Sequence, residues 1–176
     1  DGEVSIRDAS HLWGKNTKET QDAIITELGD NHIQVAVIGP AGENLVKYAC
    51  IMNGLFDAAG RGGVGAVMGS KNLKAIAVRG HDAPKVVEAK PVKDMAKWLK
   101  ANWELMRGFW EVGTGLPMDG FEAIGNLPVR NFRDGLFPAV KKIDARAVMK
   151  TIGIKMDACY ACSVRCKKVV KLDTPY

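Results

Sequence analysis

Long apolar runs are missing from this chain of 176 residues, and its cysteines are few. No stretch of about 18 consecutive apolar residues occurs, which argues against a membrane-spanning helix. The first ten residues, DGEVSIRDAS, hold neither a basic segment nor an apolar one, so no signal peptide is recognisable and we expect a cytoplasmic protein. Aromatic residues make up only 7%, and no basic stripe with interleaved aromatics occurs, which argues against nucleic-acid binding.

The composition is that of a folded protein with slightly more basic than acidic residues. Hydrophobic residues account for 47% and charged residues for 26%, a composition that excludes an intrinsically disordered protein. The length allows one large domain or one and a half, with a sizeable core. The chain starts at Asp1 rather than at a methionine and stops ten residues after its last cysteine, so we expect a piece of a longer protein.

Apolar periodicity and turn residues predict an α+β protein. The expected strands cover residues 4–7, 33–38 and 73–78, and the expected helices cover residues 18–28, 43–59, 92–107 and 144–152. Thr17 is the expected cap of the first helix, and Gly29 is expected to end it. Residues 80–92, with two prolines and few periodic apolar residues, suit a domain boundary.

Three of the four cysteines lie within eight positions, as Cys159, Cys162 and Cys166. This C-x2-C-x3-C spacing favours an iron–sulfur cluster, whose irons are held by thiolates, over a structural zinc or free thiols. Both metal centres usually have four ligands, and only three are local. We interpret Cys50, which falls in the expected helix over residues 43–59, as a core residue rather than a ligand.

Basic residues surround these cysteines, and tryptophans are scattered elsewhere. The basic cluster consists of Arg165, Lys167, Lys168 and Lys171. A polyanionic cluster or an acidic electron-carrier protein is its natural counterpart. We interpret the tryptophans as packing residues; they are Trp13, Trp98, Trp103 and Trp110.

A glycine-rich segment, Gly60-Arg-Gly62-Gly63-Val-Gly65, matches the G-x-G-x-x-G pattern letter for letter. A dinucleotide-binding fingerprint needs a strand before it and a helix after it. Here the expected element before it is a helix, and Gly69 interrupts the segment after it, so we reject that interpretation. Exposed glycine N–H groups can still bind an anion, with Arg61 adding positive charge, although a plain structural turn accounts for these residues equally well.

Longer motifs connect these features to a known family. The segments that carry the resemblance are residues 6–15, 38–53, 58–80, 125–132 and 159–166. In order along the chain, they resemble the N-terminal domain and then the second domain of the aldehyde ferredoxin oxidoreductase family. The resemblance implies a partial mixed-sheet, pterin-binding domain over residues 1–88. It also implies the start of a mainly helical, cluster-binding domain over residues 89–176.

The resemblance also implies a set of cofactors, ligands and partners. Members of the family hold tungsten or molybdenum between two pterin ligands beside a [4Fe–4S] cluster, and they oxidise aldehydes to carboxylic acids. They pass the electrons to ferredoxin or an iron–sulfur subunit, and we expect an oligomer. The implied contacts to the pterin phosphates and a bridging Mg²⁺ are Ala58, Gly60, Arg61 and Gly62. The implied cluster ligands are Cys159, Cys162 and Cys166.

The resemblance places the fourth cluster ligand and the acid–base residues beyond Tyr176, so no catalytic residue is assigned. Some members act on other substrates, such as aromatic thioesters. Two alternatives belong to other classes: a non-catalytic iron–sulfur electron-transfer module without pterin, and a zinc-stabilised binding module. Metal content distinguishes the three.

Overall fold

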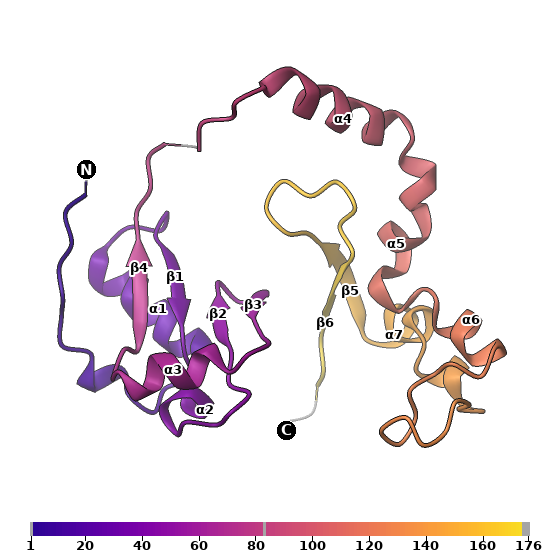
Figure 1. The fold of residues 1–176 in the computed structure, drawn as a ribbon, viewed down its shortest axis with the longest axis horizontal. Helices are drawn as coiled ribbons and strands as arrows, with labels where there is room; N and C mark the ends of the chain where they lie inside the picture. Colours follow the sequence, from indigo (N-terminus) through magenta and orange to yellow (C-terminus); the bar gives the residue numbers. More distant parts are fainter. Residues whose placement is uncertain (1, 83, 174–176) are drawn as a thin grey trace. The chain divides into compact units, whose positions relative to one another are not determined.

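A computed structural model describes residues 2–82 and 84–173 of the chain. The chain divides into two units, Asp1–Lys85 and Val86–Tyr176 (Figure 1). Among the described residues, no helix is long and apolar enough to cross a membrane.

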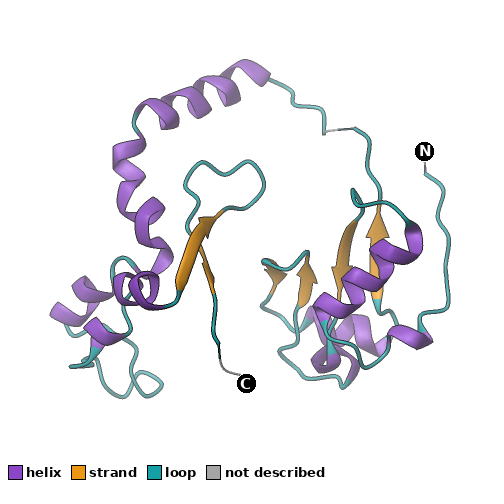
Figure 2. Cartoon of the chain, turned by 180° about the vertical axis from the view of Figure 1, so that it is seen from behind, coloured by secondary structure: helices purple, strands orange, loops and turns teal. Residues whose placement is uncertain are grey.

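The first unit is built on an antiparallel sheet. Its strands are β1 (Gln34–Val37), β2 (Ile51–Asn53), β3 (Asp57–Ala59) and β4 (Ala75–Val78), in the order β3-β2-β1-β4 (Figure 2). All neighbouring strands are antiparallel, and Ala36 of β1 lies opposite both Asn53 and Ile76. The two edge strands, β3 and β4, therefore never meet.

In the described part of the first unit, three α-helices accompany this sheet: α1 (Thr17–Leu28), α2 (Pro40–Glu43) and α3 (Val64–Ser70). The helix predicted over residues 18–28 is confirmed as α1, but its cap is Asn16 rather than Thr17. The side chain of Asn16 accepts from the backbone N–H of Glu19 while the Glu19 carboxylate accepts from the N–H of Asn16. This reciprocal pair satisfies two N–H groups that would otherwise lack partners. Gly29 ends the helix as predicted, with a left-handed φ of 67°.

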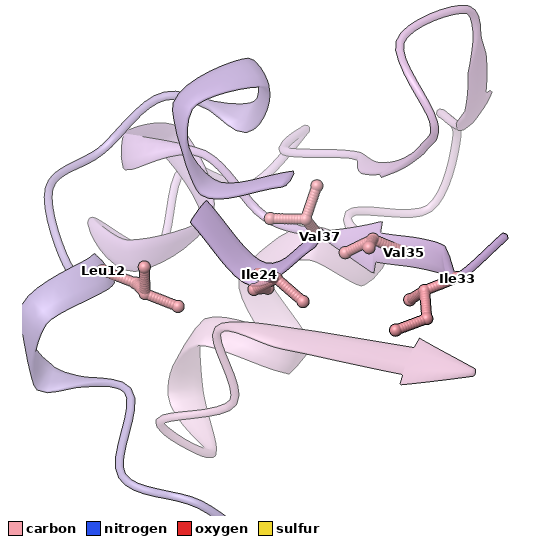
Figure 3. Close-up of a cluster of buried hydrophobic side chains, with 5 residues drawn as sticks. All are labelled: Leu12, Ile24, Ile33, Val35 and Val37. Carbon is pink, nitrogen blue, oxygen red and sulfur yellow. The ribbon is translucent and has the colours of Figure 1, made fainter. Parts of the chain in front are cut away.

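The core of the first unit lies where α1 covers one face of the sheet (Figure 3). Its buried members are Leu12, Ile24, Ile33, Val35 and Val37. Along β1, Val35 and Val37 are buried while Gln34 is exposed, which is the alternation of a strand with one covered face. The predicted strand over residues 33–38 is thus confirmed in its core, as is the strand over residues 73–78.

The helix predicted over residues 43–59 is wrong. The structure ends α2 at Glu43 and places the β2–β3 hairpin over residues 51–59. The apolar residues there do recur at helical spacing, but the Asn53-Gly54 pair after β2 favours a hairpin, and Gly54 takes a φ of 61° that suits a turn. Cys50 therefore precedes a strand, half-buried, with its Sγ 3.7 Å from the Sδ of Met52.

The strand predicted over residues 4–7 is also wrong. These residues form no strand in the structure, and the side chains of Val4 and Ile6 are 85% and 98% exposed. A strand needs a neighbour to pair with its backbone groups, and no described strand lies in register with this segment.

A buried ion pair joins α2 to the start of β4. The Nζ of Lys74 contacts the carboxylate of Glu43 and donates to the carbonyl oxygen of Lys15 at 2.9 Å. The same carboxylate accepts from the backbone N–H of Gly14 at 2.9 and 3.0 Å. Both side chains are almost wholly buried, at 0% and 4% exposure. The pair ties three chain segments together beside the core.

The second unit combines short helices with one hairpin. The helices are α4 (Ala89–Ala101), α5 (Arg107–Val112), α6 (Met118–Ala123) and α7 (Ala145–Thr151); the strands are β5 (Gly153–Asp157) and β6 (Lys167–Val170). The irregular stretch expected over residues 108–140 holds α6 and most of α5, and the helix expected over residues 92–107 ends at Ala101. The hairpin was not predicted. Mixed helix and antiparallel sheet confirm the predicted α+β class.

One glycine lets this hairpin approach the helical part. A Cβ at Gly113 would lie 2.4 Å from the carbonyl oxygen of Cys166 and 3.0 Å from the Cε of Met156. Gly113 also has a φ of 76°, which other residues rarely adopt. The end of α5 and the start of β6 can therefore meet only with a glycine at this position.

Candidate functional site

The glycine-rich segment forms the connection from β3 to α3. Ala58 lies in β3 opposite Met52, and Gly60, Arg61 and Gly62 follow in the loop, all exposed. Nothing lies within 4 Å of the position that a Cβ would take at Gly60 or Gly62. The structure thus brings the four predicted cofactor-binding residues together on one exposed strand end and loop.

Gly65 and the following Gly69 have a structural role, because they pack against neighbouring backbone. A Cβ at Gly65 would lie 2.5 Å from the carbonyl oxygen of Cys50, and one at Gly69 would lie 2.0 Å from that of Gly42. α3 therefore presents a glycine face on which the backbone of residues 42–50 rests directly. Gly63 is also buried, with the carbonyl oxygen of Lys47 2.2 Å from the position of a Cβ, so the end of the loop is fixed while Gly60 and Gly62 face outward.

The loop carries unpaired donors and a positive charge. Within the described residues, the backbone N–H groups of Arg61 and Gly62 donate no hydrogen bond, and the Arg61 guanidinium has no ion-pair partner. Gly62 and Gly63 have φ values of 90° and 69°. Consecutive exposed N–H groups beside an arginine form an environment that favours anions such as phosphate.

The structure changes the reason for rejecting a dinucleotide fingerprint. The element before Gly60 is the strand β3 and not a helix, and α3 runs through Gly69 without interruption. The rejection holds for another reason, which is topology. A Rossmann unit needs two parallel strands around the helix, whereas β3 and β4 lie at opposite edges of an antiparallel sheet.

The second candidate feature is the cysteine loop, residues 158–166, which joins β5 to β6 at the tip of the hairpin (Figure 1). Cys159 is exposed, Cys162 and Cys166 are half-buried, and all three are free thiols. The N–H of Cys162 donates to the carbonyl oxygen of Cys159 at 3.1 Å, which closes a turn. The loop's base is held by Arg165, whose Nη2 donates to the carbonyl oxygen of Met156 at 3.2 Å.

The donor set of this loop suits an iron–sulfur cluster, although its side chains do not converge in the structure. Three thiols without disulfide partners are the soft ligands that such a cluster takes. Within the described residues, no three His, Cys, Asp or Glu side chains gather as ligands of one metal ion. Ala161 and Arg165 hold φ values of 54° and 52°, strained for non-glycine residues. Strained backbone is a common feature of ligand-binding loops.

A shallow depression lies beside the cysteine loop. It is lined by Trp110, Glu111, Lys155, Met156 and Arg165. The Trp110 ring meets Trp103 edge-on at 6.2 Å between centroids. Sequence reasoning missed this feature because it had predicted neither α5 nor the β5–β6 hairpin, which bring these residues together; the only signal was the density of basic residues near the cysteines.

Comparisons with known proteins cover both units. The family model "Aldehyde ferredoxin oxidoreductase, N-terminal domain" matches residues 1–80, and "Aldehyde ferredoxin oxidoreductase, domains 2 & 3" matches residues 90–176. The chain is 42% identical to the tungsten-containing aldehyde ferredoxin oxidoreductase of Pyrococcus furiosus, over 99% of this chain and 29% of the relative. It is 44% identical to the enzyme of that name from Thermococcus kodakarensis, with the same coverage.

More distant relatives carry other names. An aliphatic sulfonate oxidoreductase, WOR-like subunit, of Pyrococcus furiosus is 33% identical over 94% of this chain. A chain of the active-site complex BamBC of benzoyl coenzyme A reductase, solved with 1,5-dienoyl-CoA, is 31% identical over 99% of this chain, with a TM-score of 0.72. The chain spans 29% of the length of each of these two proteins.

The matches extend in order through both units, over the glycine-rich loop and the cysteine loop alike. The two family models together account for all but a short stretch between residues 80 and 90. On this evidence the chain belongs to the aldehyde ferredoxin oxidoreductase family, a family of oxidoreductases.

Proposed function

We propose that this chain is part of the catalytic subunit of a tungstopterin oxidoreductase that oxidises aldehydes to carboxylic acids. In this proposal residues 1–88 are the latter part of the pterin-binding domain and residues 89–176 the start of the helical, cluster-binding domain. The electrons leave through a [4Fe–4S] cluster to ferredoxin or an iron–sulfur subunit. The protein is proposed to be a cytoplasmic oligomer.

The observation that carries the proposal is the exposed loop with its unpaired N–H groups and Arg61, in a family whose relatives are named as tungsten-containing. Gly60 and Gly62 leave room for a phosphate to approach the backbone, and the Arg61 guanidinium offsets its charge. Ala58, the middle residue of β3, is exposed and has a small side chain that leaves room for the phosphate. We propose that these four residues hold the pterin phosphates and the Mg²⁺ that bridges them.

For the cysteine loop we propose that Cys159, Cys162 and Cys166 supply three thiolates to the [4Fe–4S] cluster. The three thiols are free and lie on one short loop, which makes them available as local ligands of one cluster. The loop then orients the cluster and shields part of it through the two half-buried cysteines. When bound, the pterin metal supplies the two-electron oxidation and the cluster supplies one-electron transfer.

Metal analysis of the full-length protein tests this proposal. We expect about four irons per chain and tungsten or molybdenum close to one per chain, together with aldehyde-dependent reduction of a viologen dye. Iron without a heavy metal would favour the non-catalytic electron-transfer module, and zinc alone would contradict both. Replacing Cys162 with serine should lower the iron content and abolish dye reduction, whereas Cys50→Ser, outside the loop, should leave the iron content unchanged.

A second candidate substrate class is suggested by the relatives. The sulfonate oxidoreductase subunit and the benzoyl coenzyme A reductase chain show that similar sequences occur with non-aldehyde substrates. A protein that contains the pterin metal but does not reduce viologen with any of a range of aldehydes would favour that class. An aromatic thioester should then act as an oxidant of the dye-reduced enzyme.

The 176-residue chain by itself should not oxidise aldehydes, because we propose that the fourth cluster ligand and the acid–base residues lie outside it. Aldehyde-dependent viologen reduction by residues 1–176 alone would contradict this assignment. The same measurement on the full-length protein serves as its positive control.

A further inference from the structure

The basic excess of the chain is confined to one region. Residues 1–85 hold nine basic and ten acidic residues, and residues 86–140 hold seven of each. Residues 141–173 hold nine basic residues against three acidic ones, so this segment supplies the whole positive net charge. It is also the segment that contains the cysteine loop.

Within that segment, the excess of basic over acidic residues is concentrated in the β5–β6 hairpin. Residues 153–171 carry five basic residues and a single acid, Asp157. Lys155, Arg165 and Lys171 are exposed, and Lys168 is half-buried opposite Met156. Within the described residues, Lys155 and Lys168 form no ion pair, and Lys171 reaches Asp173 only at 3.9 Å. The charge of these side chains is therefore largely unneutralised.

The acidic groups nearby are already engaged. Glu111, which lines the depression beside the hairpin, accepts from the Nε of Arg107 at 2.7 Å. The carboxylate of Asp157 accepts from the N–H of Ala158 at 2.8 Å. Trp110 lines the same depression and is 45% exposed, which adds an apolar contact beside Lys155 and Arg165. Charged surroundings with an aromatic anchor are typical of protein–protein interfaces.

We propose that this surface, formed by Lys155, Arg165, Lys171 and Trp110 and named here the hairpin surface, docks an acidic electron-carrier protein. The inference rests on the proposed function, since it assumes that the cysteine loop holds a redox cluster. It goes further by assigning the docking site to particular side chains. Like-signed charges concentrated on one surface steer an oppositely charged partner and orient it, and Arg165 is one residue from Cys166. The carrier would therefore arrive next to the electron donor.

Charge reversal in the full-length holoenzyme tests the docking proposal. The variant Lys155→Glu/Lys171→Glu alters two exposed side chains that touch no proposed cofactor ligand. The probes are an acidic [4Fe–4S] ferredoxin and the small dye benzyl viologen, with aldehyde as the electron source. We expect kcat/KM for the ferredoxin to fall about tenfold or more at low ionic strength, with the viologen rate unchanged. Raising the salt should slow the wild type toward the variant.

A matched control carries the same charge change elsewhere in the second unit. Lys93→Glu/Lys97→Glu reverses two exposed charges on α4 and should leave the ferredoxin kcat/KM within about twofold of wild type. Lys155→Ala should give a smaller loss than the double reversal. Iron content and circular dichroism confirm that each variant is folded and loaded.

Two results would overturn the docking proposal while leaving the proposed function intact. One is a hairpin variant that reduces ferredoxin as fast as wild type with the same salt dependence. The other is an equal loss in the α4 control, which would reflect net charge alone. A wild-type protein without iron, or without aldehyde-dependent viologen reduction, would instead contradict the proposed function itself and the docking proposal with it.

Discussion

Lys74 is the largest fully buried side chain of the molecule's described part, and it carries a charge. Removing its ammonium leaves the Glu43 carboxylate buried, with only the Gly14 N–H as a partner. We expect Lys74→Met to lower the free energy of unfolding by about 3–5 kcal/mol. The Glu43 charge would stay buried without its partner, and this costs more free energy than the Lys74–Glu43 ion pair contributes. Urea denaturation of residues 1–176 measures this.

The matched control is Lys18→Met, which removes an exposed ion pair with Asp22 on α1. It should cost at most about 0.5 kcal/mol, since solvent screens such a pair. Equal losses at both sites would contradict the structural role assigned to Lys74. Glu43→Gln/Lys74→Met should recover part of the stability, because no buried charge is left alone.

Alanine substitutions at Gly69 and Gly60 compare a glycine packed against backbone with a glycine that faces open space. A Cβ at Gly69 would clash with the Gly42 carbonyl oxygen, so we expect Gly69→Ala to destabilise the first unit by about 1–3 kcal/mol. Gly60→Ala meets nothing within 4 Å and should change the free energy of unfolding by less than about 0.5 kcal/mol. Thermal unfolding followed by circular dichroism compares them, and a harmless Gly69→Ala would show that α3 does not rest on residues 42–50.

At the scale of elements, Asp30 connects the end of α1 to the end of β4. Its carboxylate accepts from the N–H of His32 and from the Nε of Arg79, each at 2.8 Å. The hydrogen bond from His32 first, and then Arg79, lower the pKa of Asp30 below its ordinary value of 3.8. Because the folded pKa is depressed, the stabilisation is present above the unfolded pKa and is lost as the pH falls through the folded one.

We therefore expect Asp30→Asn to be less stable than wild type at about pH 5, with a difference that shrinks as the pH falls below 3.8 and through the folded pKa. The loss should be small, since the group is exposed. Chemical denaturation at a series of pH values checks this, and Asp82→Asn, which alters another exposed carboxylate, is the control. A difference that grows as the pH falls would have the wrong sign.

At the scale of the whole molecule, burial is unevenly distributed between the two units. Among described residues, the buried hydrophobic side chains of the second unit are Val140 and Ala145, while the first unit holds the others. α4 has no buried residue, although Val92, Met95 and Trp98 form an apolar face. A helix without burial has little beyond its own hydrogen bonds to resist opening.

We expect amide hydrogen exchange in residues 1–176 to be slow in α1 and β1 and fast in α4, by about two orders of magnitude or more. Mass spectrometry of peptides covering both regions measures the ratio. In the full-length protein, α4 should become protected if its apolar face is covered there. Equal protection of α4 and α1 in the 176-residue chain would contradict the burial pattern.

Much of the molecule could be read from local patterns. The helix over residues 18–28 and the strands over 33–38 and 73–78 each rest on signals within a short stretch of chain. The family resemblance rests on several such stretches in order along the chain. The helix predicted over 43–59 failed because apolar spacing cannot distinguish a hairpin from a helix when the turn residues, Asn53 and Gly54, are overlooked. The strand predicted over 4–7 failed because strand formation depends on a neighbour.

In the candidate site, too, some features follow from local sequence and others from the tertiary structure. Local sequence predicts which residues carry the chemistry, because that prediction needs only residue identities and spacings: glycines beside Arg61 and three closely spaced cysteines. Tertiary structure decided how they are used. It separated the exposed glycines from those on which the backbone of residues 42–50 rests, and it paired Lys74 with Glu43 across 31 positions. It also placed Trp110 beside Lys155 and Arg165. These outcomes depend on burial and on contacts between distant segments, which no local pattern contains.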